Sequence, residues 1–347
     1  MRAYQVPSPG LPVILNELET PKPSGTEVLI KTIACGLCHS DVHIHEGAFN
    51  LGNGNKLALP LPSPYTLGHE IFGEVVGFGE NAAGINLGDK VIVYPWIGCG
   101  SCSICNSGEE HLCNAGQVLG VFKTGGFADH VVVPHSKYLF KPNNVPSHLA
   151  GSYACSGLTA YSALKKGAPY HNKSMIIVGA GGVGMMAIQI AKAAYNINPI
   201  VVDVDQAKLN AALEQGASAV INPLDENAFL KILELTGGEL CAAIDFVGSE
   251  QSVGFGINTL AKGGKYIIVG LFGGELKIPL PMIPIMERKI LGSYVGSPQD
   301  MKELMELVNT GKIDPIPVEQ RPISDVNAAL TDLKEGKVLG RLSLIHD

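Results

Sequence analysis

The densest group of potential metal ligands in this sequence is a run of four cysteines between residues 98 and 113. Cys99, Cys102, Cys105 and Cys113 follow the spacing C-x2-C-x2-C-x7-C in the segment GCGSCSICNSGEEHLC. Four thiolates complete a tetrahedral zinc shell and leave no position for a substrate, which is typical of a structural site. An iron–sulfur cluster is the alternative, although the bacterial ferredoxin run has three residues before its last cysteine and this sequence has seven. The cluster therefore predicts a structural zinc site, with His111 of the same loop expected at the surface.

Three other segments carry residues that could bind a catalytic metal. CGLCHSDVHIHEG holds Cys35, Cys38, His39, His43 and His45, LGHEIFG holds His69 and Glu70, and YACSGLTAY holds Cys155. A catalytic zinc needs three protein ligands and an open position, and two cysteines with one histidine form a known set. A single cysteine or histidine in a core is more often structural. The spacing alone therefore leaves open which of these residues meet in the folded chain.

A glycine-rich turn predicts a dinucleotide site in the second half of the chain. Gly179, Gly181 and Gly184 form the pattern G-x-G-x-x-G in GAGGVG, between a strand-like run and a helix-like run, which is the context that the motif requires. The glycines allow a tight turn, a close approach to a pyrophosphate and close helix–sheet packing. Asp203 ends the next strand-like run, where a carboxylate binds the ribose hydroxyls and repels a 2′-phosphate. We therefore expect NAD rather than NADP; a plain turn, with Asp203 as a cap, is the alternative.

The helices and strands that must position these residues follow two different sequence patterns, one in each part of the chain. Residues 1 to about 150 hold short β-branched runs separated by turn residues, such as EVLIKTIAC and DKVIVYP, which predict a mainly β region. From about 155 to 295, six strand-like runs alternate with helix-like segments, which predicts a doubly wound parallel sheet and an α/β fold. Two helix-like segments and a last strand-like run, GRLSLI, follow.

Length, charge and composition exclude several classes of protein. The chain has 347 residues, enough for two domains, and its formal net charge of -7 offers no basic surface to a nucleic acid. No stretch approaches the roughly 18 apolar residues of a membrane span, and MRAYQVPSPG contains no apolar signal-peptide core. We therefore expect a cytoplasmic protein with no membrane or nucleic-acid partner, in which clustered cysteines are reduced and bind metal.

Five segments, taken together, reveal a family resemblance over essentially the whole chain. The segments are CGLCHSD, GHE, the four-cysteine segment, CSGLTAY and GAGGVG. In their order and spacing, the sequence resembles the zinc-dependent alcohol dehydrogenases of the medium-chain dehydrogenase/reductase family. The resemblance implies a GroES-like catalytic domain over 1–153, with a structural zinc lobe at about 95–115. It further implies a Rossmann domain for NAD over 154–295, a segment over 296–347 that returns to the catalytic domain, and two Zn²⁺ per chain.

The resemblance also assigns roles around the catalytic metal. Cys38, His69 and Cys155 would bind the catalytic zinc, and Glu70 would lie behind it. Asp41 would orient a ligand histidine, as metal sites commonly require. Ser40 would hydrogen-bond the substrate hydroxyl, and His43 would carry the proton to solvent.

The same resemblance implies a set of contacts to the cofactor. His39 and Arg341 would meet the pyrophosphate, whereas Thr159 and Val183 would pack near the nicotinamide. The full set, besides the three motif glycines and Asp203, is His39, Thr159, Gly182, Val183, Val269, Leu271 and Arg341.

The implied activity is reversible hydride transfer between an alcohol and NAD, giving an aldehyde or a ketone. A hydrophobic primary or secondary alcohol is expected, because the candidate pocket residues are mostly apolar: Phe49, Leu59, Trp96, Leu119, Leu271 and Tyr294. A polyol dehydrogenase is an alternative, although Cys155 stands where sorbitol-type relatives have a carboxylate ligand. A non-catalytic binding protein is another alternative, but such relatives have lost zinc ligands that are all present here.

Several further expectations concern packing and assembly. The segment 50–66 is rich in Gly, Pro and Asn, so we expect a loop that shapes the substrate pocket. Trp96 could line the substrate cleft or belong to the core. We expect Cys35 and Cys241 to pack internally, whereas His45 should be a surface residue. The short link after Cys113 resembles that of tetrameric microbial relatives, so we expect a homotetramer, with a dimer as the second choice.

Overall fold

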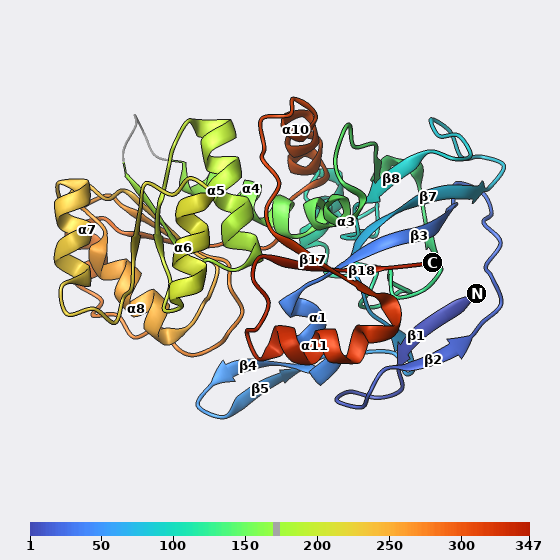
Figure 1. Cartoon of the computed structure of the whole chain (residues 1–347), viewed down its shortest axis with the longest axis horizontal. Coiled ribbons are helices and arrows are strands. Elements are labelled where there is room, and N and C mark those ends of the chain that lie inside the picture. Colours follow the sequence, from blue (N-terminus) through green and yellow to red (C-terminus); the bar gives the residue numbers. More distant parts are fainter. Residues whose placement is uncertain (169–173) are drawn as a thin grey trace. The chain divides into compact units, whose positions relative to one another are not determined.

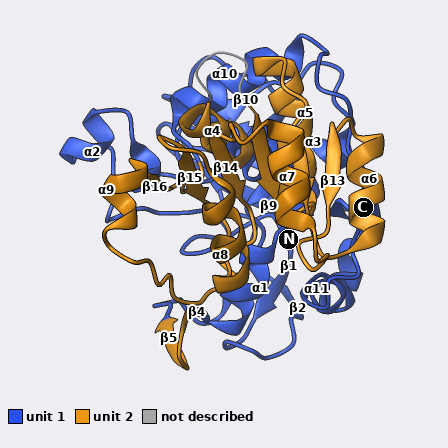
Figure 2. Ribbon diagram, turned by 90° about the vertical axis from the view of Figure 1, so that its left-hand side faces the viewer, with its two compact units in different colours: residues 1–48, 58–158, 296–347 blue, residues 49–57, 159–295 orange. Residues whose placement is uncertain are grey.

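The structure is a computed structural model that describes residues 1–168 and 174–347. The chain divides into two compact units (Figure 2). The first unit comprises residues 1–48, 58–158 and 296–347, and the second comprises residues 49–57 and 159–295. No helix within the described ranges is long and apolar enough to cross a membrane.

A seven-stranded, mainly antiparallel sheet is the largest element of the first unit. Its order is β10-β8-β7-β3-β18-β17, and β9 also pairs with β3. The last strand of the chain, β18, lies between β3 and β17, so residues from the two ends of the sequence are neighbours in one sheet (Figure 1). The strands are β3 (Val28–Leu37), β7 (Glu70–Phe78), β8 (Lys90–Val93), β9 (His130–Val133), β10 (Leu139–Phe140), β17 (Val318–Pro322) and β18 (Arg341–Ile345). A second sheet has the order β2 (Ile14–Glu17), β1 (Arg2–Val6), β6 (Tyr65–Thr66).

Local sequence signals explain where the helices of this unit begin and end. The Asp41 carboxylate accepts a hydrogen bond from the Cys38 N–H at the start of α1, and Gly47 ends that helix in the left-handed region at φ 76°. Ser297 and Asp300 cap each other at the start of α10, where Pro298 occupies the first turn. The helices are α1 (His39–Glu46), α2 (Ser103–Asn106), α3 (Ser147–Ala150), α10 (Pro298–Asn309) and α11 (Val326–Lys334), with 3₁₀ turns η1 (Glu110–Leu112), η2 (Ser136–Tyr138), η3 (Gly151–Ala154) and η4 (Ile323–Asp325).

The segment predicted as a loop over 50–66 is not irregular throughout. Strands β4 (Ala48–Gly52) and β5 (Asn55–Ala58) form a two-stranded hairpin, and β6 lies near the end of the segment. The cause is the turn sequence Gly52-Asn53-Gly54, in which all three residues take positive φ values, because such residues favour tight hairpin turns. Within the second unit the hairpin packs against residues 273–275, since a Cβ on Gly52 would lie 3.0 Å from the Gly274 carbonyl carbon.

The second unit contains a six-stranded sheet in which every neighbouring pair is parallel. Its order is β13-β12-β11-β14-β15-β16, which places the first strand of the unit in the middle and confirms the predicted doubly wound α/β fold. The strands are β11 (Met175–Val178), β12 (Ile200–Val202), β13 (Ala219–Ile221), β14 (Ala242–Asp245), β15 (Lys265–Ile268) and β16 (Lys289–Gly292). The helices are α4 (Ser156–Gly167), whose first three residues belong to the first unit, α5 (Gly182–Tyr195), α6 (Gln206–Glu214), α7 (Ala228–Thr236), α8 (Glu250–Thr259) and α9 (Met282–Met286).

Continuous apolar strands account for the core of the second unit. Ile176, Val202 and Ile257 belong to one buried cluster, in which strand residues pack against helix residues. Such unbroken apolar runs are typical of strands covered on both faces, as parallel sheets require. Tyr266 is also fully buried in this cluster, and its hydroxyl donates to Asp245 at 2.9 Å, so the polar end of the side chain is satisfied.

Candidate metal and cofactor sites

Four buried side chains converge in the first unit. Cys38 follows β3, His69 precedes β7, Glu70 begins β7, and Cys155 lies between η3 and α4. One potential ligand atom from each lies within 4.8 Å of the others, and all four residues are buried. The antiparallel pairing of β3 with β7 causes part of this convergence, because Gly36 near the end of β3 faces Glu70. The structure thus brings together the three residues that the resemblance proposed as catalytic zinc ligands.

Asp41 fixes the orientation of the His69 ring. Its Oδ1 atom lies 3.1 Å from His69 Nδ1 and accepts a hydrogen bond from the Gly68 N–H at 3.2 Å, while both side chains are fully buried. A hydrogen bond from Nδ1–H to a carboxylate leaves Nε2 as the unprotonated ring nitrogen, which is the form that binds metals. His69 Nε2 is buried and has no hydrogen-bond partner within the described residues. A buried nitrogen lone pair without a hydrogen-bond donor is suited to bind a metal ion.

The two thiols and the imidazole perturb one another strongly. A hydrogen bond from the Cys155 thiol lowers the pKa of Cys38 well below its usual value, and the same bond raises the pKa of Cys155. Burial opposes the charged form of His69, yet the neighbouring Asp41 carboxylate raises the pKa of the ring overall. Charged and proton-sharing groups this close together are typical of a site that a cation occupies.

Glu70 is held on both of its oxygen atoms. The Ser156 hydroxyl donates to Oε1 at 2.7 Å, and the Arg341 guanidinium forms an ion pair with Oε2. Burial raises the pKa of Glu70, and the Arg341 charge works against that shift. Gly36 makes room for this arrangement, since a Cβ there would lie 2.1 Å from Glu70 Oε2. Arg341 comes from β18, so its side chain reaches the site from the C-terminal end of the chain; its predicted contact with a pyrophosphate remains a prediction.

The first cluster fits a catalytic zinc ion. Two cysteines and one histidine are the donor set of the zinc site in alcohol-oxidising enzymes, and three protein ligands leave a fourth position open. The buried, unpartnered Nε2 atom of His69 and the thiol pair beside it supply the donors without rearrangement of the strands that carry them.

The four-cysteine segment fits a structural zinc ion. Three of its Sγ–Sγ distances are 3.9 Å for Cys99–Cys105, 3.5 Å for Cys102–Cys105 and 3.9 Å for Cys102–Cys113, and none of these cysteines is in a disulfide. Zinc–sulfur bonds of about 2.3 Å in a tetrahedron give sulfur–sulfur distances of roughly 3.8 Å. An iron–sulfur cluster would hold its thiolates further apart, because several iron and sulfide atoms lie between them.

Glu110 supports this lobe, and the sequence analysis did not identify it. Its carboxylate accepts hydrogen bonds from Lys137 Nζ at 2.7 Å and from the Tyr138 hydroxyl at 2.5 Å, and both partners lie in η2. No sequence signal links residues that are 27 and 28 positions apart on two short turns. The predicted surface position of His111 is wrong: its side chain is only 4% exposed, because η1 turns Glu110 and His111 inward while Leu112 faces solvent.

The glycine-rich turn has the geometry that its motif requires. Gly179 follows β11 at φ 96°, Gly181 is the N-cap of α5, and Gly182 and Val183 form the first turn of that helix. A Cβ on Gly184 would lie 1.9 Å from the Gly179 carbonyl oxygen, so only glycine fits. The loop therefore exposes backbone N–H groups at a helix N-terminus, which is the arrangement that binds a pyrophosphate.

Asp203 follows β12 and reaches this turn. Its Oδ2 atom accepts a hydrogen bond from the Ala180 N–H at 2.7 Å, and Oδ1 accepts one from the Asp205 N–H at 2.9 Å. The carboxylate therefore stabilises the turn directly, as the alternative interpretation expected, and it lies where a ribose contact was predicted. Both roles are compatible, since a carboxylate offers about four lone-pair positions.

The other predicted cofactor and relay residues lie on two helices and next to one strand, and the helix α1 falls in a region that the sequence predicted to be mainly β. His39, Ser40 and His43 are on α1, and the spacing of Ser40 and His43 places them on one face of the helix. Burial lowers the pKa of His43. In the second unit, Thr159 is buried on α4, Val269 follows β15 and Leu271 is 46% exposed.

The candidate substrate-pocket residues are distributed over both units. Phe49, Leu271 and Tyr294 belong to the second unit, whereas Leu59, Trp96 and Leu119 belong to the first. Trp96 is 5% exposed, its Nε1–H donates to the Ala154 carbonyl at 3.0 Å, and its ring centre lies 5.5 Å from that of His69. Trp96 is therefore a core residue that also borders the predicted metal site.

The remaining cysteine and histidine predictions concern packing. Cys35 is fully buried in β3, as expected of a core residue. Cys241, just before β14, is only partly buried, and its thiol contacts the Ser174 carbonyl at 3.5 Å. His45 is half-buried on α1, with Nε2 2.8 Å from the Leu11 carbonyl.

Comparisons with known proteins agree with this geometry. Residues 24–144 match the family model of the alcohol dehydrogenase GroES-like domain, and residues 182–310 match that of the zinc-binding dehydrogenase. The chain is 40% identical to an NAD-dependent alcohol dehydrogenase of Sulfurisphaera tokodaii, over 99% of this chain and 100% of that protein. The crystal structure of an alcohol dehydrogenase from Aeropyrum pernix covers 99% of this chain and is itself fully covered, with a TM-score of 0.87 and 31% identity.

A cobalt- and zinc-bound thermostable alcohol dehydrogenase from Pyrobaculum aerophilum is similar over 99% of both chains, with a TM-score of 0.86 and 26% identity. The two family-model matches include Cys38, His69 and the four-cysteine segment, and the second match starts at Gly182, the first residue of α5. We conclude that this chain belongs to the zinc-dependent alcohol dehydrogenase family.

Proposed function

We propose that this protein is an NAD-dependent, zinc-containing alcohol dehydrogenase that transfers a hydride reversibly between a primary or secondary alcohol and NAD. The observation that carries the proposal is the buried Cys38–His69–Cys155 cluster, in which Asp41 holds the ring and leaves His69 Nε2 without a partner. Family membership and the named relatives support the same activity.

In this mechanism Cys38, His69 and Cys155 hold the catalytic zinc. When bound, zinc supplies Lewis-acid chemistry, which lowers the pKa of a hydroxyl group at its open position. Ser40 would hydrogen-bond the substrate hydroxyl and, as it takes that proton, would release its own hydroxyl proton toward His43, which would pass it to solvent. Burial lowers the pKa of His43, so the ring is neutral near pH 7 and can accept a proton. Asp41 maintains the His69 tautomer, and Ser156 with Arg341 keeps the Glu70 carboxylate directed within the site.

The second unit binds the cofactor in this proposal. The N–H groups around Gly181 and the start of α5 bind the pyrophosphate, and Asp203 selects NAD, because its charge repels a 2′-phosphate. The cofactor contacts of His39, Thr159, Val183, Val269, Leu271 and Arg341 are part of the same proposal.

We also propose a hydrophobic alcohol as substrate and a homotetramer as the assembly, with a dimer as the second choice. The apolar candidate pocket residues support the substrate class. Assembly is supported by the second unit, where the edge strand β16 lies in a segment with many exposed apolar side chains: Leu271, Phe272, Leu280, Ile285, Leu291 and Tyr294. Reduced thiols in both clusters suit a cytoplasmic location. Sedimentation at micromolar concentration distinguishes the assemblies.

The decisive experiment combines metal content with turnover. Purified protein should contain two zinc ions per chain and should oxidise members of an alcohol panel with NAD faster than with NADP. A protein with two zinc ions and no turnover on any alcohol or polyol would support a non-catalytic binding role. Faster turnover with polyols than with hydrophobic alcohols would contradict the substrate proposal, and tighter binding of NADP would contradict the role of Asp203.

A further inference from the structure

A buried carboxylate, that of Asp245, lies at the end of a strand in the second unit. The residue ends β14, is fully buried and is not among the proposed cofactor contacts. The strand order places β14 on one side of β11, which leads into the glycine-rich turn, and β12, which Asp203 follows, on the other side. A dinucleotide with its adenosine ribose at Asp203 and its pyrophosphate at the glycine-rich turn must therefore extend its nicotinamide half over the ends of β14 and β15.

Four hydrogen bonds fill the Asp245 carboxylate. Its Oδ1 atom accepts from the N–H groups of Val247 at 2.8 Å and Gly248 at 2.9 Å. Its Oδ2 atom accepts from the hydroxyls of Ser252 at 2.8 Å and Tyr266 at 2.9 Å. Four donors match the roughly four lone-pair positions of an ionised carboxylate. Burial raises the pKa of Asp245, and these hydrogen bonds work against that shift. One oxygen thus holds the turn after β14, and the other is bound to the helix and strand behind it.

The backbone of Asp245 holds the segment after β15 as well. Its carbonyl accepts hydrogen bonds from the N–H groups of Val269 at 2.9 Å and Gly270 at 3.0 Å. A Cβ on Gly248 would lie 2.0 Å from the Gly270 carbonyl oxygen, so the two segments pack backbone against backbone. The segment that contains Val269 and Leu271 therefore rests on the turn that the Asp245 carboxylate fixes.

The turn after β14 also contacts the glycine-rich turn. A Cβ on Gly179 would lie 2.8 Å from Val247 Cγ2. The Phe272 N–H donates to the Val247 carbonyl at 3.2 Å. Val247 therefore contacts both the segment proposed to bind the pyrophosphate and the segment proposed to contact the nicotinamide.

We propose that Asp245 is a positioning residue for the nicotinamide half of the cofactor, because its carboxylate fixes the turn 246–248 on which residues 269–272 rest. Asp245 does not touch the cofactor in this proposal and acts only through the backbone of these two segments. The inference rests on the proposed use of NAD.

The test compares NAD with AMP, which lacks the nicotinamide half. Calorimetric titration of the zinc-loaded protein, without alcohol, gives both dissociation constants. Asp245→Ala leaves the N–H groups of Val247 and Gly248 without their acceptor. Asp245→Asn keeps one oxygen for these two groups, while the hydroxyls of Ser252 and Tyr266 can accept from its amide.

A second variant perturbs the same segments and leaves the carboxylate in place. A Cβ on Gly270 would lie 2.1 Å from the Val247 carbonyl carbon, so Gly270→Ala must separate the two segments. It should cause the same selective loss of NAD affinity, and it decides the test if Asp245→Ala does not fold.

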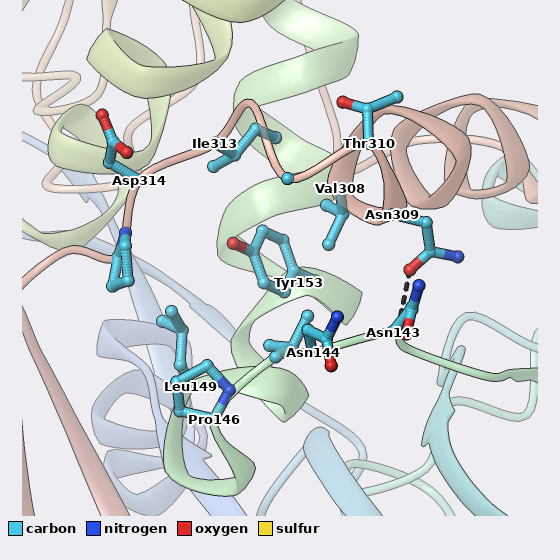
Figure 3. A pocket seen from close by; sticks show the side chains of 13 residues that line it. Asn143, Asn144, Pro146, Leu149, Tyr153, Val308, Asn309, Thr310, Ile313 and Asp314 are labelled. Atoms are coloured by element: carbon cyan, nitrogen blue, oxygen red, sulfur yellow. Dashed lines mark hydrogen bonds between the residues drawn. The ribbon is translucent and has the colours of Figure 1, made fainter.

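Two controls separate this role from a general loss of stability. Tyr266→Phe removes one hydrogen bond from the same carboxylate and leaves its two bonds to the turn. Asn309→Ala lies in the first unit, at a cavity of about 310 Å³, and removes the hydrogen bond that Asn309 Oδ1 accepts from the Asn143 N–H at 2.8 Å (Figure 3). Both variants should bind NAD and AMP normally, even where they lower the melting temperature.

We expect Asp245→Ala to raise the Kd for NAD about tenfold, the effect of one to two net hydrogen bonds, and to change the Kd for AMP by less than about twofold. Asp245→Asn should restore the Kd for NAD to within about twofold of the unsubstituted protein. Equal losses of NAD and AMP affinity in Asp245→Ala, or unchanged NAD affinity in Gly270→Ala, would overturn the inference and leave the proposed function intact. An unsubstituted protein that binds AMP but not NAD would instead overturn the proposed function, and this inference with it.

Discussion

At the scale of single residues, Asp41 arranges the proposed catalytic site through three separate contacts. One oxygen lies against His69 Nδ1 and accepts the Gly68 N–H, and the other accepts the Cys38 N–H. One carboxylate therefore positions the loop before β7, the histidine ring and the start of the helix that follows a cysteine ligand. Metal sites lose affinity when such a partner is removed, even though the ligands themselves remain.

Replacing Asp41 with asparagine should weaken zinc binding at the catalytic site by roughly 10- to 100-fold, because the amide no longer fixes the His69 tautomer. Competition with a chromophoric chelator measures the affinity. Asp89→Asn, which removes a carboxylate that pairs with Lys141 away from the metal clusters, is the control and should bind zinc normally. Equal zinc affinities of the Asp41→Asn and Asp89→Asn proteins would contradict the role of Asp41 in orienting His69.

His43→Ala tests the proton relay through its pH dependence. Burial lowers the pKa of His43 below 6.5, so wild-type alcohol oxidation should fall only as the pH drops through that lowered value, where His43 becomes protonated and can no longer accept. The variant should lose this limb of the kcat profile and turn over at least about tenfold more slowly. His45→Ala on the same helix is the control, since its ring contacts the Leu11 carbonyl. A His43→Ala profile identical to wild type would exclude the relay.

At the scale of elements, close backbone packing limits which residues the glycine-rich turn tolerates. Gly184→Ala would place a Cβ 1.9 Å from the Gly179 carbonyl oxygen, so β11 and α5 must separate. We expect a loss of about 1–3 kcal/mol in the free energy of unfolding and weaker NAD binding.

Gly254→Ala is the matched control for that substitution. Gly254 lies inside α8, where a Cβ would meet no atom within 4 Å, so alanine should stabilise the helix by roughly 0.5–1 kcal/mol. Urea denaturation and NAD titration measure both variants. Equal stability of the two proteins would contradict the packing argument.

The four-cysteine lobe is the element whose metal should affect folding rather than turnover. Cys102→Ser should reduce the zinc content from two to one per chain and lower the melting temperature, because a closed zinc site contributes to folding. Cys241→Ser, at the partly buried cysteine before β14, is the control. A Cys102→Ser protein that melts normally but has no activity would reverse the assignment of the two sites.

The elements also show which features the sequence could predict. The four cysteines lie within fifteen residues, and the glycine motif within six, so local spacing was sufficient for both. The hairpin of β4 and β5 was missed because a glycine-rich segment was interpreted as irregular, although Gly52-Asn53-Gly54 is a hairpin turn. Cys38, His69 and Cys155 meet only through the pairing of β3 with β7 and the packing of η3, which no periodicity encodes; the family resemblance joined them. The Arg341–Glu70 ion pair spans 271 positions and could not be derived locally.

At the scale of the whole molecule, the chain leaves its first unit after residue 158 and returns to it at residue 296. The final strand occupies an interior place in the seven-stranded sheet, with Leu342 and Leu344 fully buried. Deletion of residues 341–347 should therefore prevent folding of the first unit and give insoluble protein. Deletion of Asp347 alone removes only an exposed ion pair with Arg2 and should leave solubility and melting unchanged. Soluble expression and circular dichroism compare the two truncations, and a folded 1–340 chain would contradict the expectation.

The place of β18 also sets an order of events during synthesis. All four cysteines of the structural lobe have been translated by residue 113, when about a third of the chain exists, so that lobe can take up its metal on the nascent chain. The catalytic cluster needs Cys155 and, for the charge that balances Glu70, Arg341, which is translated 228 residues after the last cysteine of the lobe, Cys113. The structural metal can thus be bound early in synthesis, whereas the catalytic metal site is completed only after Arg341 has been translated.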